Sequence, residues 1–126
     1  MLSTLHNRAY QDFSTLLTDF GNFIESTQNQ TNAGAIEREF VNLQQWFEKN
    51  IYNLDEKGIE EAYIPRWQAI QREINREFKL LTTDVLFLAS ARQQDTKTKR
   101  LKNIGDRLVK LTSYCQGILK ETESKQ

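Results

Sequence analysis

The chain is short of the residues that interrupt or cross-link a fold: its 126 residues include one Cys, one Pro and five Gly. The single thiol, Cys115, cannot form an internal disulfide, which favours a reducing compartment. So few turn-forming residues exclude a turn-rich β-protein and a disordered linker. No apolar run approaches the roughly 18 residues of a membrane span, and the amino end lacks the apolar core of a signal peptide. We therefore expect a cytoplasmic protein.

Residues that carry most enzymatic chemistry are equally scarce. The one histidine, His6, cannot supply the Glu-x-x-His pairs of a di-metal helical bundle, and we expect it to be exposed and incidental at a mobile end. None of the glycines falls in a phosphate-binding frame. Cys115 has no histidine nearby in sequence and occupies a core position, as a buried structural thiol does. The sequence therefore predicts a protein that is not an enzyme and has no metal and no cofactor.

Apolar residues recur at steps of three and four along four stretches, which indicates amphipathic helices. The sequence predicts an all-α single domain over residues 1–126, built as an antiparallel bundle of about four helices with a long third helix. The expected helices cover residues 4–26, 33–56, 64–92 and 96–122. Their repeating apolar positions are, in chain order, Tyr10, Phe13, Leu17, Phe20 and Ile24; Ile36, Phe40, Leu43, Phe47, Ile51 and Leu54; Trp67, Ile70, Ile74, Phe78, Leu81, Val85 and Leu88; and Leu101, Ile104, Leu108, Leu111, Cys115 and Ile118.

Polar and turn-forming residues predict where these helices begin and end. Ser3 or Thr4 is expected to cap the first helix, and Asp95 or Thr96 the fourth. Residues 26–32 are polar and without a period, so we expect a loop there. The run at residues 55–58 is expected to close the second helix, with Gly58 as its C-terminal cap.

A formal net charge of zero conceals two halves of opposite sign. Residues 1–62 carry four Lys and Arg against ten Asp and Glu, a net charge of −6. Residues 63–126 carry thirteen Lys and Arg against seven acids, a net charge of +6. Either the halves neutralise each other within the bundle, or a basic surface on the second half meets an acidic partner.

The strongest surface feature is a basic cluster around the turn between the third and fourth helices. It is either a solvated face, a docking surface for an acidic protein, or a surface for nucleic acid or membrane. A sequence pI of about 6.6 and the lack of interleaved aromatic residues argue against nucleic acid. A nucleic-acid-associated protein or a general helical adaptor remains the alternative function. The basic cluster consists of Arg92, Lys97, Lys99, Arg100, Lys102, Arg107 and Lys110, and all but Lys110 are predicted to bind the partner.

Asp84 stands out as a carboxylate within the apolar run LLTTDVLFLA. Because an isolated buried charge is costly, we expect Asp84 to pair with an Arg or Lys of the fourth helix; a role at a subunit contact is the alternative. Leu80 and Phe87 lie on a second apolar line of the third helix, on either side of Asp84. One bundle would not cover both faces of that helix, so Leu80, Asp84 and Phe87 are predicted to form a homodimer face.

Residues 68–119 carry the pattern of a known family. The segments EINREFKLL at residues 73–81, DVLFL at 84–88 and ARQ at 91–93 resemble the PatD family of small cyanobacterial proteins. The later run from Asp106-Arg107-Leu108 through Tyr114-Cys115 to Ile118-Leu119 is similar to it as well. The resemblance implies an all-α cytoplasmic protein without catalytic activity. It also implies a protein that binds the tubulin-like division GTPase FtsZ, promotes FtsZ assembly and influences how often heterocysts form.

Overall fold

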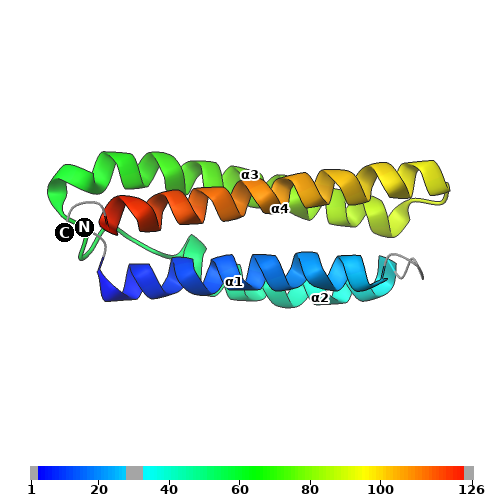
Figure 1. The fold of residues 1–126 in the computed structure, drawn as a ribbon, viewed down its shortest axis with the longest axis horizontal. Helices are drawn as coiled ribbons and strands as arrows, with labels where there is room; N and C mark the ends of the chain where they lie inside the picture. Colours follow the sequence, from blue (N-terminus) through cyan, green and yellow to red (C-terminus); the bar gives the residue numbers. More distant parts are fainter. Residues whose placement is uncertain (1–2, 28–32, 124–126) are drawn as a thin grey trace.

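The computed structural model describes residues 3–27 and 33–123, and its helices form an elongated antiparallel bundle (Figure 1). The helices are α1 (Thr4–Thr27), α2 (Ala33–Phe47), α3 (Ile64–Ser90) and α4 (Gln94–Glu123). Successive helices run in opposite directions, α3 packs along α4, α4 along α1, and the short α2 against α1 and α3. The described residues contain no strand, so the predicted all-α bundle is confirmed.

The core lies where the predicted apolar stripes meet along the bundle axis. Phe47 of α2 and Phe78 of α3 stack with ring centroids 3.9 Å apart and planes within 5°. Phe13 of α1 lies 5.3 Å from the ring of Phe47, so three helices share one aromatic layer. Aromatic contacts add to the free energy gained from the buried area, so these three rings stabilise the core. Of the predicted stripe positions, only Leu54, Ile70 and Leu101 are partly exposed.

The second helix is shorter than predicted. After α2 the chain makes one π-helical segment, η1 (Glu48–Tyr52), and the helical path then stops, four residues before the predicted end at 56. Asp55 Oδ1 instead accepts a hydrogen bond from the backbone N–H of Lys57 at 3.0 Å, a local turn that competes with helix hydrogen bonds. A 3₁₀ turn, η2 (Glu61–Tyr63), leads into α3, where proline occupies the first turn as predicted.

Gly58 is not the C-terminal cap of the second helix but a turn residue in the connection that follows it. Its φ of +86° lies in the left-handed region that glycine enters without steric cost. A Cβ at this position would lie 2.9 Å from the Cβ of Ser3. The connection between α2 and α3 therefore packs closely against the start of α1.

The prediction that His6 is exposed and incidental is wrong. The side chain is 1% exposed, its Nε2 donates to the backbone carbonyl of Asp55 at 2.8 Å, and its Nδ1 lies within hydrogen-bond distance of the Ser3 hydroxyl, at 2.6 Å. A carbonyl oxygen only accepts, so Nε2 carries a proton. Ser3 Oγ also accepts the backbone N–H of His6 at 3.2 Å, which confirms Ser3 as the N-cap of α1. His6 thus ties the start of α1 to the α2–α3 connection.

A chain of hydrogen bonds continues from this end into the core. The indole Nε1 of Trp67 donates to Tyr10 Oη at 2.7 Å, and Tyr10 Oη donates to Gln71 Oε1 at 2.6 Å. Gln71 Nε2 then donates to the carbonyl of Ile51 in the π-helical segment at 2.8 Å. Burial raises the pKa of Tyr10, with the Trp67 hydrogen bond opposing it, so the hydroxyl stays neutral. These bonds fix α1, η1 and α3 relative to one another.

The turn between α3 and α4 has the predicted length of three residues but lies two residues earlier in the chain. α3 ends at Ser90 rather than 92, because Ala91 takes an extended backbone with ψ of 135°. α4 begins at Gln94, so Asp95 and Thr96, predicted as caps, lie inside its first turn. Asp95 there contributes a negative charge that is favourable near a helix N-terminus. Of the loop predicted at residues 26–32, residues 26 and 27 belong instead to α1, and residues 28–32, like the end of the carboxyl tail, lie outside the described residues.

Candidate interaction surface

Two buried carboxylates of α3 face a row of cations on α4. Glu77 and Asp84 are seven residues apart, as are Arg100 and Arg107, so each pair lies on one line of its helix. Because the helices are antiparallel, Arg107 faces both carboxylates and Arg100 faces Asp84. We call this arrangement the ionic seam; it consists of Glu77, Asp84, Arg100, Arg107 and Lys110.

Arg107 is the centre of the ionic seam. Its Nε lies 2.5 Å from Asp84 Oδ2, and its Nη1 lies 2.9 Å from Glu77 Oε2. Lys110 Nζ approaches the other oxygen of Glu77 at 3.0 Å, and Arg100 Nη1 approaches Asp84 Oδ1 at 3.3 Å. Charge-assisted hydrogen bonds of this kind offset the cost of taking carboxylates out of water. The expected pairing of Asp84 with a cation of the fourth helix is confirmed.

Contacts within the seam favour the ionised forms of Glu77 and Arg107. Burial raises the pKa of Glu77, but hydrogen bonds and charges from Lys110 and Arg107 outweigh burial, and the net pKa lies below its ordinary value of 4.5. The hydrogen bond to Asp84 raises the pKa of Arg107 despite the opposing effect of burial. Both groups therefore remain charged at neutral pH.

The cations of the seam, unlike its carboxylates, reach the surface. The side chains of Glu77 and Asp84 are 1% and 6% exposed, whereas those of Arg107, Arg100 and Lys110 are 28%, 32% and 50% exposed. The guanidinium groups have N–H donors beyond those used in the seam. A small cleft of about 240 Å³ between α3 and α4 is lined by Glu77, Asn103, Asp106, Arg107 and Lys110. The outer side of the seam is thus a solvent-facing layer of positive groups.

The structure divides the predicted basic cluster into two sets. Arg100, Arg107 and Lys110 are held by Glu77 and Asp84 within the ionic seam. The other set, which we call the free cations, consists of Arg92, Lys97, Lys99 and Lys102. Within the described residues, no ion pair holds any of these four side chains. Lys97 is half-buried, and the other three are exposed.

The predicted dimer face has one member that faces inward. Asp84 is buried and paired with Arg107 and Arg100, so it does not present its carboxylate to a second subunit. Leu80 is half-buried and Phe87 is 48% exposed, as their place outside the main stripe predicts. The guanidinium carbon of Arg100 lies 4.6 Å from the centroid of the Phe87 ring, a cation–π contact. Phe87 of the predicted dimer face is therefore in contact with Arg100 of the predicted basic cluster.

Sequence reasoning missed Glu77, the more deeply buried of the two carboxylates. The available signal was its spacing, because Glu77 precedes Asp84 by seven residues and so shares its helical line. Glu77 sits among Arg76, Phe78 and Lys79 and reads as a solvated position, whereas Asp84 is conspicuous within an apolar run.

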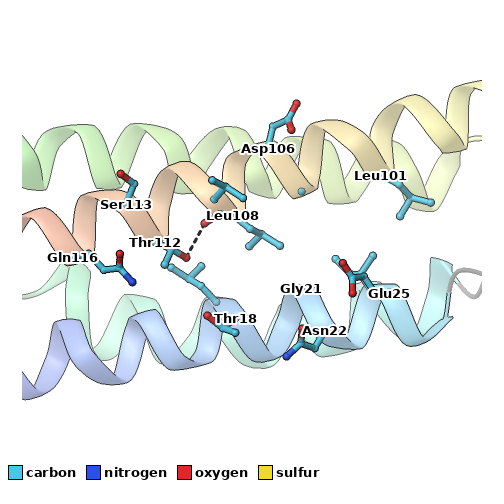
Figure 2. A pocket seen from close by; sticks show the side chains of 14 residues that line it. Thr18, Gly21, Asn22, Glu25, Leu101, Asp106, Leu108, Thr112, Ser113 and Gln116 are labelled. Carbon is cyan, nitrogen blue, oxygen red and sulfur yellow. Dashed lines mark hydrogen bonds between the residues drawn. The ribbon is translucent and has the colours of Figure 1, made fainter.

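A second hollow lies between α1 and α4 (Figure 2). This groove, about 590 Å³ in volume, is lined by aliphatic residues such as Leu17 and Leu108 together with small and short polar residues such as Gly21 and Thr112. Its two carboxylates do not converge: Glu25 belongs to α1, and Asp106 points away from α1 in Figure 2. The Thr112 hydroxyl donates to the Leu108 carbonyl of its own helix at 2.8 Å. The groove therefore shows no pairing of an acid with a base or nucleophile.

Other chemistry-bearing residues are buried or dispersed. Burial raises the pKa of the Cys115 thiol to about 12, so it stays protonated in the core, as a structural thiol does. Within residues 3–27 and 33–123, no three His, Cys, Asp or Glu side chains gather closely enough to hold a metal ion. Among the described helices, none has the length and apolar character needed to cross a membrane.

Comparisons of the chain with known protein families, with curated proteins and with solved structures find no match.

Proposed function

We propose that this protein is a non-enzymatic interaction protein that binds an acidic protein partner through its free cations, Arg92, Lys97, Lys99 and Lys102. The observation that carries the proposal is that these side chains gather at one end of the bundle without serving its ion pairs. Cations in the first turns of a helix oppose its macrodipole, so Lys97 and Lys99 do not stabilise α4. A positive region with no structural use is suited to attract a negative partner.

FtsZ is the partner that the resemblance to the PatD family supplies. In this proposal the protein binds FtsZ in the cytoplasm, promotes its assembly and thereby influences heterocyst patterning. The contact is electrostatic at long range, because surface charges attract over about 8–10 Å at physiological ionic strength. Binding should therefore weaken as the salt concentration rises.

Co-sedimentation with FtsZ filaments tests the proposal. The parent chain should pellet with the filaments, and a variant with Lys97→Glu, Lys99→Glu and Lys102→Glu should stay in the supernatant. A matched control carries Arg8→Glu, Arg72→Glu and Lys79→Glu, three exposed positions away from the free cations that give the same change in net charge. Pelleting of the lysine variant like the parent would refute the proposal, and equal loss by the control would reduce the effect to net charge. Duplex DNA serves as the competing ligand, with a steep salt dependence if it binds.

A homodimer through Leu80 and Phe87 is the competing use of the neighbouring surface and remains a prediction. Light scattering at tens of micromolar protein measures it directly, and a monomer there would count against the dimer. A dimer would let one protein bridge two filaments, since linked sites bind more tightly than single ones.

A further inference from the structure

The outer surface of α3 carries an apolar patch close to the α3–α4 turn. Phe87 is 48% exposed, and Leu80, two helical turns before it on the same line of the helix, is half-buried. Single exposed apolar residues are ordinary, but these two lie on one face of α3; Leu86, also exposed, is turned about 100° from Phe87 and lies outside that face. We call this pair the Phe87 patch; it consists of Leu80 and Phe87.

Positive charge borders the Phe87 patch. Residues 84–107, which run from this part of α3 through the turn into α4, carry six Lys and Arg and three Asp, a net charge of +3 in a chain whose total is zero. Arg100 connects the two features, since its guanidinium lies against the Phe87 ring and also contacts Asp84 at 3.3 Å. An aromatic and an arginine in contact are the residue types enriched at the energetic centres of protein interfaces.

We propose that the Phe87 patch is a docking site for an acidic segment of a partner protein that carries an apolar anchor side chain. The anchor packs on Phe87, beside Leu80, and neighbouring carboxylates of the segment accept hydrogen bonds from Arg100 and from the free cations. The inference rests on the proposed function and deepens it, because it assigns specificity to the apolar contact and attraction to the lysines.

The charges at this surface favour such a segment over two other occupants. A second copy docked symmetrically through the same patch would bring two regions of net charge +3 together, which is repulsive. A nucleic acid requires a surface that neutralises many phosphates, but Asp84, Asp95 and Asp106 lie among the cations, and the pI is about 6.6. A peptide with few carboxylates and an apolar side chain matches both the modest charge and the exposed ring.

Two synthetic peptides of equal charge test the site by fluorescence anisotropy. One is a short glutamate-rich peptide with two leucines a helical turn apart, and the other has serines in place of both leucines. The parent chain should bind the leucine peptide about tenfold more tightly than the serine peptide. Phe87→Ser should lose this preference while leaving the weak binding of the serine peptide unchanged.

Val109→Ser is the matched control, because Val109 is a 71% exposed apolar residue on α4 that lines the groove toward α1. It should retain the full preference, and circular dichroism should show the same helix content in both variants. Equal binding of the two peptides by the parent, or equal effects of Phe87→Ser and Val109→Ser, would overturn the inference. It would also be overturned if Phe87→Ser converted a dimer into a monomer, or if a single-stranded oligonucleotide outcompeted the leucine peptide.

The outcomes separate this inference from the proposed function. If the triple lysine reversal abolishes FtsZ co-sedimentation but Phe87→Ser leaves the leucine preference intact, the proposed function stands and the docking site is wrong. If FtsZ does not co-sediment but the leucine preference depends on Phe87, the docking site stands and the partner is another acidic protein.

Discussion

The bundle contains two buried polar networks that differ in charge and in access to solvent. At the end where α1 begins, Tyr10, Trp67 and Gln71 exchange neutral hydrogen bonds, and the Gln71 amide reaches the carbonyl of Ile51. Along the α3–α4 contact, Glu77 and Asp84 are held by cations that are 28–50% exposed. The donors and acceptors of the first network, the neutral network, bond to one another inside the protein. The second network, the ionic seam, exposes the donor groups of its cations to solvent.

This difference indicates which network serves the fold and which can also serve binding. A neutral network whose donors and acceptors are paired fixes neighbouring helices without attracting a ligand. The ionic seam buries its carboxylates and exposes its cations, so it presents a positive electrostatic potential to the solvent. The Phe87 patch and the free cations belong to the same two helices and the same turn as the ionic seam, and Arg100 of the seam contacts Phe87.

The largest expected effect comes from opening the neutral network. Tyr10→Phe removes the hydroxyl that accepts from Trp67 and donates to Gln71, both buried, so an indole N–H and an amide oxygen lose their partner. We expect a loss of about 2–4 kcal/mol in the free energy of unfolding, since each stranded buried group costs about 1–3 kcal/mol. Urea denaturation measures it.

Tyr52→Phe is the control for this prediction. Tyr52 is 61% exposed on the π-helical segment, and loss of its hydroxyl should change stability by less than about 0.5 kcal/mol. Equal urea midpoints for Tyr10→Phe and the parent would mean that the neutral network contributes nothing to stability.

The sequence predicted the fold because burial follows helical spacing, but it did not predict the neutral network, and it predicted only part of the ionic seam. The stripe from Tyr10 to Ile24 extends back to His6 at the same spacing, yet a histidine close to the chain start reads as exposed. Its burial depends on the α2–α3 connection folding over the start of α1, a contact between Ser3 and Gly58 that no local pattern encodes.

The ionic seam was half-predicted for a similar reason. Asp84 stands out within an apolar run, and its pairing with α4 followed from the cost of a buried charge. Which cations turn inward depends on the rotation of α4 against α3. Arg100 and Arg107 face α3, whereas Lys99 and Lys102 do not, and this division decides which members of the basic cluster are available to a partner.

A smaller, pH-dependent effect should come from the ionic seam. Glu77→Gln removes a buried charge that Arg107 and Lys110 hold, and should cost about 2 kcal/mol at pH 7. This is less than the 3–5 kcal/mol typical of breaking a fully buried pair, because both cations reach water and Arg107 keeps Asp84. Urea unfolding at several pH values measures the effect.

The sign of the pH dependence follows from the pKa of Glu77. That pKa lies below its ordinary value of 4.5 in the folded protein, so the stabilisation is complete above pH 4.5 and is lost as the pH falls through the lower folded value. The difference between parent and Glu77→Gln should therefore shrink in acid. Glu73→Gln, at a 46% exposed side chain paired with Arg76, is the control and should be nearly neutral at every pH. A difference that grows in acid would contradict the assignment.

The smallest expected effects come from replacing two glycines by alanine, Gly58 in the α2–α3 connection and Gly105 on α4. At Gly58, which packs against the start of α1, φ is +86° and a Cβ would lie 2.9 Å from the Cβ of Ser3, so Gly58→Ala should destabilise the protein by about 1–2 kcal/mol. At Gly105, on α4, a Cβ would meet nothing within 4 Å, so this glycine does not serve a close helix crossing. Gly105→Ala should stabilise by about 0.5–1 kcal/mol, because alanine favours the helix interior and restricts the unfolded chain. Thermal unfolding of both variants gives the two signs. A destabilising Gly105→Ala would mean that α4 lies closer to α1 than the groove in Figure 2 indicates.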